Sequence, residues 1–351
     1  MKAFHGFVCR SNKMSSCFPR KDDNNLKNDA MLLKQLIATF NGKCNPIRSF
    51  SEKELRKATI NYDNQRLIIT NKIFYKLYNG FLQDRQIFVM KFEPIIFQEK
   101  EEIIQKGINN IVFATQMKHK NFLKLIGCCL ETQFPILVFD FVGCTTLADR
   151  ILSHSQPRLG PLLLKLRLKI AMEIAHAVAY LHLGFPRPIV FGSLAPWNIF
   201  LDEEYAVKLF DFSVSEFIPE GKTHLEVHLT KKVWYEYVPP DLLLAIAPNR
   251  KFNCNEKVDV YCFGELLFML LSGLSLKKFL KNKGFQMEDI GPNNLNEIID
   301  PVIVGEGICS IKEQQLLALV RLVSECLCLE PEDMPNMIDV TKQLRKMYKS
   351  S

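Results

Sequence analysis

The sequence lacks any apolar run near the ~20 residues that span a bilayer, so we expect no membrane-spanning helix. Its longest apolar stretches, near residues 162–164 and 266–271, are short and typical of core helices. The first ten residues lack the apolar region of a signal peptide, and position 2 lacks the glycine that N-myristoylation requires. These absences predict a cytoplasmic protein that meets a membrane at most peripherally.

Zinc-binding Cys-x-x-Cys pairs are also absent, although the chain holds 11 cysteines. Several of these cysteines stand in apolar runs, among them Cys128, Cys129 and Cys262. An odd and scattered set predicts reduced, mostly buried thiols and not a disulfide framework. We therefore expect no firm metal site among the cysteines.

The net positive charge is confined to the beginning of the chain. Residues 1–60 hold twelve basic and five acidic residues, which accounts for the whole net charge of +7. The neutral remainder has no net positive field to attract phosphate, so we expect no nucleic-acid partner. Residues 1–28 are expected to form a solvated tail. The alternative is attraction to an anionic membrane surface, helped by acylation of Cys9 or Cys17.

Apolar periodicity predicts several helices. Met31, Leu32, Leu36 and Phe40 predict a helix over 29–40, which ends at Asn41-Gly42. Further helices are expected over 97–117 and 163–183. In the stretch after residue 50, Ser51 and Glu54 have the spacing of a capping box, which predicts another helix start.

The most specific pattern lies in the second half of the chain. Residues 189–213, IVFGSLAPWNIFLDEEYAVKLFDFS, enter a loop, turn, and end on a short strand that delivers Asp211-Phe212. Two flanking blocks, HKNFLKLIGCCLE at 119–131 and VDVYCFGELLFMLLSG at 258–273, accompany it. Together they resemble the catalytic loop, metal-binding strand and neighbouring blocks of plant receptor-like kinases. The resemblance covers roughly residues 50–348.

The resemblance implies an α+β, two-lobed protein-kinase fold. Its small, mostly β N-lobe would span residues 50–142 and its larger, mostly α C-lobe residues 143–348. Residues 1–49 would be a basic N-terminal extension that contains a short helix.

On the kinase pattern, the catalytic loop has lost its reactive groups. Ser193 stands where the catalytic Asp is expected, and Ala195 where the loop Lys is expected. Serine cannot accept the substrate hydroxyl proton as a carboxylate does, and a missing general base alone costs about 10²–10⁴-fold in rate. We therefore expect no catalytic residue and no phosphotransfer. The alternative, an atypical weakly active serine/threonine kinase, needs a replacement base, and Asp202 or Glu203 stands too far along the loop.

The nucleotide-binding elements are altered as well. No glycine lies between Tyr62 and Asn79, where a glycine-rich loop would cradle the ATP phosphates. Asn110 stands where the helix of an active kinase carries the Glu that pairs with the strand lysine. Residual ATP and Mg²⁺ positions remain at Lys91, which takes the phosphate-pairing position, Asn198 and Asp211. They support either weak Mg·ATP binding or a purely structural role, and no cofactor is required.

Three other positions bear on how the predicted C-lobe is held. Asp259 is expected to accept backbone N–H bonds from the catalytic loop. Asp241 and Met334 stand in place of a Glu–Arg ion pair, which predicts a less tightly fixed activation segment.

A narrower resemblance rests on NGKCNPIRSF at 41–50, the glycine-free loop, and IPEGK at 218–222. On these motifs the chain is identified as a member of the HOPZ-ETI-deficient-related kinases, which are plant receptor-like cytoplasmic pseudokinases. This implies an adaptor in innate immunity that binds a coiled-coil NLR immune receptor. It would sense receptor-like cytoplasmic kinases modified by bacterial effectors, or be the effector target itself.

The sensing face is expected in the activation segment, at Lys222, Thr223, Thr230, Lys231 and Lys232. A nucleotide-binding scaffold outside immunity is the remaining alternative. It differs from the adaptor in requiring a response to Mg·ATP.

Overall fold

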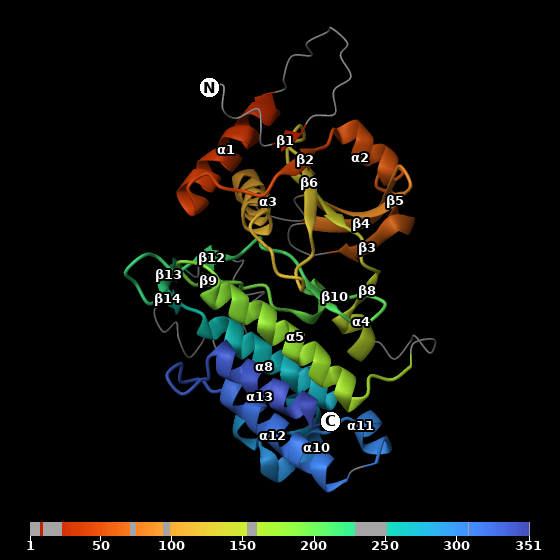
Figure 1. Cartoon of the computed structure of the whole chain (residues 1–351), viewed down its shortest axis with the longest axis vertical. Coiled ribbons are helices and arrows are strands. Elements are labelled where there is room, and N and C mark those ends of the chain that lie inside the picture. Colours follow the sequence, from red (N-terminus) through yellow and green to blue (C-terminus); the bar gives the residue numbers. More distant parts are fainter. Residues whose placement is uncertain are drawn as a thin grey trace. The chain divides into compact units, whose positions relative to one another are not determined.

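The computed structural model describes residues 8–9, 23–70, 75–93, 99–152, 160–228, 251–307 and 309–350 (Figure 1). The chain folds as two compact units. The first unit is Met1–Cys144 together with Phe210–Ser215, and the second is Thr145–Leu209 together with Glu216–Ser351. The short segment that carries Asp211 and Phe212 therefore belongs to the first unit, although it is far in sequence from the rest of that unit.

A seven-stranded sheet forms the centre of the first unit, in the order β1-β2-β6-β7-β5-β4-β3. Neighbouring strands are antiparallel except for the parallel pairs β1–β2 and β2–β6. The strands are β1 (Val8–Cys9), β2 (Ile47–Ser49), β3 (Leu67–Thr70), β4 (Tyr75–Leu82), β5 (Arg85–Phe92), β6 (Leu125–Cys129) and β7 (Ile136–Asp140).

The two faces of β5 meet different helices, because side chains alternate along a strand. Ile87 and Val89 pack into a core with Leu55 of α2 (Glu52–Ala58). On the other face, the Sδ of Met90 lies 3.6 Å from the amide nitrogen of Asn110 on α3 (Lys100–Ala114). The predicted capping box of Ser51 and Glu54 at the start of α2 is confirmed. A short 3₁₀ turn, η1 (Asn64–Arg66), precedes β3.

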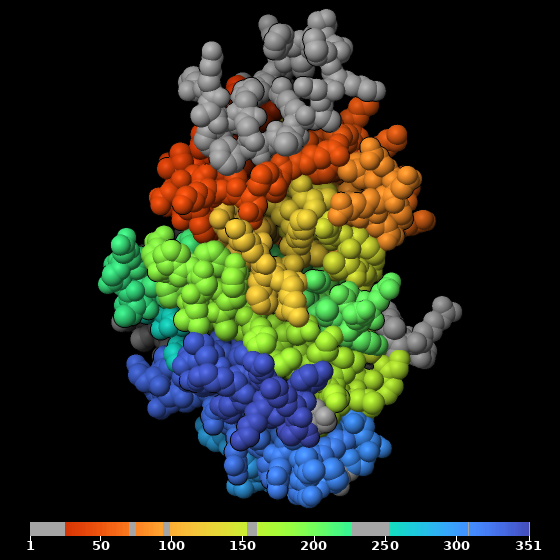
Figure 2. Space-filling model, in the orientation of Figure 1, coloured from red at the N-terminus to blue at the C-terminus, as the bar shows by residue number. Residues whose placement is uncertain are grey.

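Helix α1 (Asp23–Phe40) packs on α3 and lies on the surface of the first unit, in red in Figure 2. It begins six residues before the predicted start, because polar residues and not apolar ones anchor its first turns. The buried Asn28 donates hydrogen bonds to the carbonyl oxygens of Leu130 and Thr132, at 3.2 and 3.0 Å. The helix ends at the predicted Asn41-Gly42, where both residues have positive φ.

The second unit is mostly helical. Its helix α5 confirms the prediction over 163–183 and packs against α8 and α13. The helices in the described part of this unit are α4 (Leu147–Ile151), α5 (Leu164–Leu183), α8 (Lys257–Ser272), α9 (Leu276–Lys283), α10 (Leu295–Ile298), α11 (Pro301–Gly305), α12 (Ser310–Cys326) and α13 (Met337–Lys349), with 3₁₀ turns η2 (Pro196–Asn198), η3 (Met287–Asp289) and η4 (Pro292–Asn294).

Three small sheets lie among the described residues of the second unit, with the strand orders β11-β10-β8, β12-β9 and β13-β14. These strands are β8 (Thr145–Thr146), β9 (Ile189–Val190), β10 (Ile199–Leu201), β11 (Val207–Leu209), β12 (Glu216–Phe217), β13 (Leu225–His228) and β14 (Lys251–Cys254). The predicted loop 191–198 thus lies between β9 and β10 and ends in η2.

Within the described ranges, no single helix is long and apolar enough to cross a membrane. Taken together, α8 and α9 pass the same test of length and apolar composition, but the two helices are bent by 60° at the break between them.

Candidate functional site

Asp211 is completely buried in the first unit, and both of its carboxylate oxygens accept hydrogen bonds. The hydroxyl of Tyr75 donates to Oδ2 at 3.1 Å. The side-chain amide of Asn110 and the backbone N–H of Ser213 donate to Oδ1, at 3.3 and 3.1 Å. Burial raises the pKa of the Asp211 carboxyl, and the hydrogen bonds from Ser213 and Tyr75 oppose that effect. The chain's own donors therefore surround this carboxyl group.

The backbone of Asp211 is strained, since its φ is +74°. A residue other than glycine in this region costs on the order of 1 kcal/mol or more, and it persists only where its surroundings fix it. Here the side chain of Asp211 is held from β4, from α3 and from the following turn. The strain and the hydrogen bonds together define one conformation for the segment.

Tyr75 is the group at this site that the sequence analysis did not identify. It is the first residue of β4 and is fully buried, with its ring centre 5.7 Å from that of Phe92 on β5. Its position inside the glycine-free stretch between Tyr62 and Asn79 was the only signal in the sequence. No general rule assigns a tyrosine there to the metal-binding aspartate, so its contact could only be found in the structure.

Asn110 lies where the sequence analysis placed the missing helix glutamate. It is fully buried on α3, and its amide nitrogen also lies 3.3 Å from Oγ of Ser213. Its oxygen Oδ1 is buried and has no hydrogen-bond partner among the described residues. An amide at this position can hold the aspartate in place, but it cannot form an ion pair with a lysine.

Lys91 does not lie with Asp211. Its Nζ donates to Oε2 of Glu93 at 2.8 Å and lies 5.1 Å from the centre of the Tyr62 ring, on the sheet face that α2 covers. Because strand side chains alternate, an offset of one residue exchanges the two faces. The β5 residue on the face of Asn110 and Asp211 is Met90, so the assignment of Lys91 to the phosphate-pairing position does not agree with the register.

Glu93 gives Lys91 a local partner. Burial acts to raise the pKa of Glu93, but hydrogen bonds from Lys76 and Lys91 hold it below its usual value. The Nζ of Lys76 lies 2.5 Å from Oε1 of Glu93. The charge of Lys91 is thus compensated on its own face of the sheet.

In the second unit, Asn198 bonds to Ser193, the residue that stands where the catalytic aspartate is expected. Its side-chain amide donates to Oγ of Ser193 at 2.7 Å and to the carbonyl oxygen of Ser193 at 3.1 Å. Both residues are fully buried, and Ala195 is also buried. This arrangement stabilises the loop, and Ser193 brings no carboxylate to it.

Asp259 accepts the predicted backbone hydrogen bonds from the catalytic loop. The N–H groups of Phe191 and Gly192 lie 2.8 and 2.9 Å from its two oxygens. Nε2 of His182 lies 3.0 Å from the same carboxylate. The expectation that Asp259 maintains the loop is confirmed.

Only part of the predicted sensing face falls within the described residues. Lys222 and Thr223 are exposed, and Oγ1 of Thr223 lies 3.2 Å from Nδ1 of His224. Thr230, Lys231, Lys232 and Asp241 lie outside the described residues. Met334 is buried, and its carbonyl oxygen accepts a hydrogen bond from Nζ of Lys257 at 2.6 Å.

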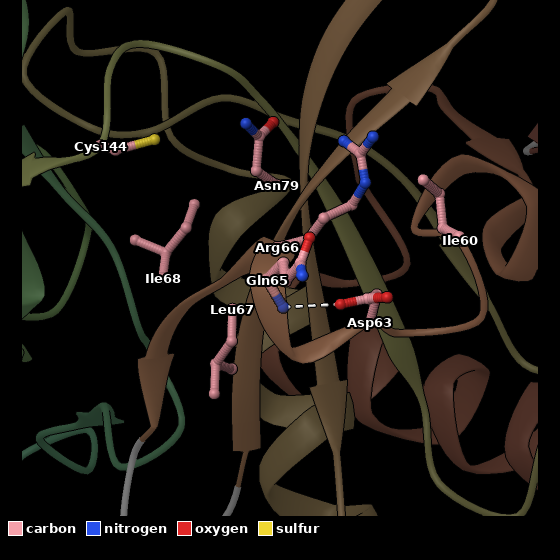
Figure 3. A pocket seen from close by; sticks show the side chains of 8 residues that line it. All are labelled: Ile60, Asp63, Gln65, Arg66, Leu67, Ile68, Asn79 and Cys144. Atoms are coloured by element: carbon pink, nitrogen blue, oxygen red, sulfur yellow. Dashed lines mark hydrogen bonds between the residues drawn. The ribbon is translucent and has the colours of Figure 1, made fainter.

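A separate pocket of about 510 Å³ opens on the first unit (Figure 3). Neither Tyr75 nor Asp211 lines it. Its lining mixes apolar side chains with one acid, one base and a thiol whose pKa is raised by burial. The residues are Ile60, Asp63, Gln65, Arg66, Leu67, Ile68, Asn79 and Cys144.

Asp211, Asn198 and Asp259 lie in a part of the chain that matches a known protein family. The protein kinase domain family matches residues 75–344, a range that includes all three of these positions. The chain belongs to the protein kinase family. The predicted α+β fold is confirmed, with a small, mostly β lobe and a larger, mostly helical lobe.

Relatives that match over most of their own length place the chain in one group of this family, the ZED1-related kinases. The chain is 35% identical to the Arabidopsis thaliana protein named non-functional pseudokinase ZED1, over 96% of this chain and 100% of that protein. It is 35% identical to the non-functional pseudokinase ZRK2 of the same plant, over 92% and 89%. It is 34% identical to the Arabidopsis serine/threonine-protein kinase ZRK1, over 93% and 92%. The family resemblance is confirmed, and these relatives' names differ on activity.

Kinases use Mg·ATP, and the residues around Asp211 do not fit it. Both oxygens that would bind Mg²⁺ already accept hydrogen bonds from Tyr75, Asn110 and Ser213. The strand residue on this face is Met90, which brings no charge to a phosphate. Lys106 on α3 supplies some positive potential, which acts to lower the pKa of Asp211. It does not release the carboxylate from its three donors.

Proposed function

We propose that this kinase-like protein is a catalytically inactive adaptor and not a phosphotransferase. The observation that carries the proposal is that both carboxylate oxygens of Asp211 accept hydrogen bonds from within the protein. The donors lie on β4, on α3 and in the turn that follows Asp211. Phosphoryl transfer depends almost entirely on positioning and charge stabilisation by metal and lysine. Ser193 in place of the catalytic aspartate and Met90 on the nucleotide-facing side of β5 point the same way. The names of two relatives agree with this proposal.

The second candidate is an atypical, weakly active serine/threonine kinase, which the name of one relative favours. It needs a base near the catalytic loop. Asp202 is engaged in a turn, where its Oδ1 accepts N–H bonds from Glu204 at 3.0 Å and from Ala206 at 2.8 Å. It therefore acts as a turn residue, which disfavours this candidate.

Purified full-length protein tests inactivity directly. We expect no radiolabel transfer from ATP to itself or to a general substrate, and no rise in melting temperature with Mg·ATP. The matched control is an Asp211→Asn variant measured beside it. Transfer by the wild type that the variant loses would establish the atypical kinase. Stabilisation by Mg·ATP without transfer would favour the nucleotide-binding scaffold.

We propose further that the adaptor acts in plant innate immunity, in the cytoplasm and peripherally at the plasma membrane. Its proposed partners are a coiled-coil NLR immune receptor, receptor-like cytoplasmic kinases and bacterial effectors. Two exposed features support a binding role. Leu26 and Ile37 on the outer side of α1 are 52% and 53% exposed. Lys222 and Thr223 are exposed in the described start of the activation segment.

A pull-down from plant tissue tests the adaptor role. The tagged protein should recover an NLR receptor, and a second kinase after infection, identified by mass spectrometry. A Leu26→Ser, Ile37→Ser variant should reduce that recovery if α1 contributes contacts, whereas Lys34→Ala on the same helix should not. Recovery of neither partner class by the wild type in repeated experiments would contradict the proposal.

A further inference from the structure

A continuous line of polar contacts joins the N-terminal helix to the segment after Asp211. Nε2 of Gln35 on α1 donates to Oδ1 of Asn109 on α3 at 2.6 Å. Nδ2 of Asn109 in turn donates to the carbonyl oxygens of Phe212 at 2.8 Å and Ser215 at 2.9 Å. Asn109 is 7% exposed, and its hydrogen bonds to the turn are buried. A single buried amide thus connects α1 with both ends of the turn 212–215.

A second line of contacts also joins α1 to this segment, through α3, and consists of aromatic rings. The ring of Phe40, the last residue of α1, meets that of Phe113 on α3 edge to face, with centres 5.8 Å apart. The ring of Phe113 stacks on that of Phe212, with centres 6.2 Å apart and an angle of 10° between the planes. Phe113 and Phe212 are almost completely buried. Aromatic pairs in such arrangements contribute beyond their buried area.

Further contacts hold α1 and the following loop against the unit. Gln105 on α3 donates to Oε1 of Gln35, which fixes the orientation of that amide. The backbone N–H of Asn45 donates to the carbonyl oxygen of Thr115 at 3.3 Å, and Nε2 of Gln116 donates to that of Lys43 at 2.7 Å. Residues 35–45 therefore contact both α3 and the residues that follow it.

We propose that α1 is a conformational latch, which fixes the start of the activation segment, Phe212–Ser215, through Asn109 and Phe113 of α3. Without the contacts from α1, Asn109 and Phe113 are free to move, so they hold the turn less firmly. A ligand that draws α1 away would therefore loosen the turn from a distance, because both lines of contact would break together. The latch lies wholly within the first unit and does not depend on the adaptor role.

Hydrogen exchange of the full-length protein tests the latch. Gln35→Ala should speed exchange of the Ser213 and Ser215 amides about five-fold, the effect of losing one partly buried hydrogen bond. Phe40→Leu should act in the same direction through Phe113. Lys34→Ala, one residue away on α1, is the matched control and should change nothing. Asn109→Ala removes the direct bonds to the turn and serves as the positive control.

The experiment has three informative outcomes. Faster exchange confined to the turn and α3 in the Gln35 and Phe40 variants would support the latch. If Asn109→Ala speeds exchange while both α1 variants match Lys34→Ala, α1 is not a latch. If the α1 variants speed exchange equally in β4 and β5, they lower the stability of the whole unit, and the latch is also contradicted.

Discussion

Tyr75 donates a hydrogen bond to Asp211 over 3.1 Å, between residues 136 positions apart in the chain. Both side chains are fully buried. In the kinase fold, an aspartate at this position meets Mg²⁺, and here it meets a phenol from the first unit's own sheet. The hydroxyl provides a hydrogen bond to a buried carboxyl group whose own backbone is strained.

Tyr75→Phe tests that relationship. The change keeps the ring and removes one donor from a buried acceptor, so we expect the first unit to lose about 1–2 kcal/mol of stability. The decrease should appear in its melting or urea transition. Tyr78→Phe removes a hydroxyl from the opposite face of the same strand and is the matched control. Equal losses of stability in the two variants would show that the hydrogen bond to Asp211 does not stabilise the first unit.

Lys91→Met tests the register of β5. In an active kinase, replacement of the strand lysine abolishes nucleotide-dependent activity. Here Lys91 pairs with Glu93 at a partly exposed position, so the variant should lose no more than about 1 kcal/mol of stability. Its response to Mg·ATP in a thermal-shift assay should equal that of the wild type. A wild-type response that Lys91→Met removes would show that Lys91 serves a nucleotide after all.

The sequence could predict much of the fold because its patterns are local or shared by a family. The capping box at Ser51 needs only a serine and a glutamate three residues apart. The role of Asp259 could be predicted because Asp259 belongs to the block at 258–273, which matches the kinase pattern together with the catalytic loop. Helix α5 could be found because apolar residues repeat at helical spacing along it.

The register of β5 and the contacts of Asp211 could not be predicted in the same way. Met90 and Lys91 are adjacent in an apolar strand, and a lysine in either position would satisfy the motif. Which of them faces α3 depends on strand pairing across the whole sheet. The bond from Tyr75 joins distant segments, and no spacing in the sequence records it.

Asp259→Asn should destabilise the second unit. The aspartate is fully buried and accepts backbone hydrogen bonds from Phe191 and Gly192. An amide replaces one acceptor by a donor that faces another donor, so we expect a loss of about 2–4 kcal/mol. Urea unfolding followed by circular dichroism measures it. Asp202→Asn, in a surface turn, should cost much less, and a comparable loss there would refute the special role of Asp259.

Glu93→Gln should change the response of stability to acid. Its pKa in the folded protein lies below the ordinary value of 4.5, so the ionised form contributes stability that is present above that pH. This contribution is lost as the pH falls through the folded pKa, because the hydrogen bonds from Lys76 and Lys91 then lose their charged acceptor. The wild type should therefore melt at a higher temperature than the variant at pH 7, and the difference should shrink below about pH 4.5. Melting temperatures from pH 7 to pH 3 measure it, with Glu288→Gln as an exposed control. A difference that stays constant over this range would mean that Glu93 acts through packing and not through its charge.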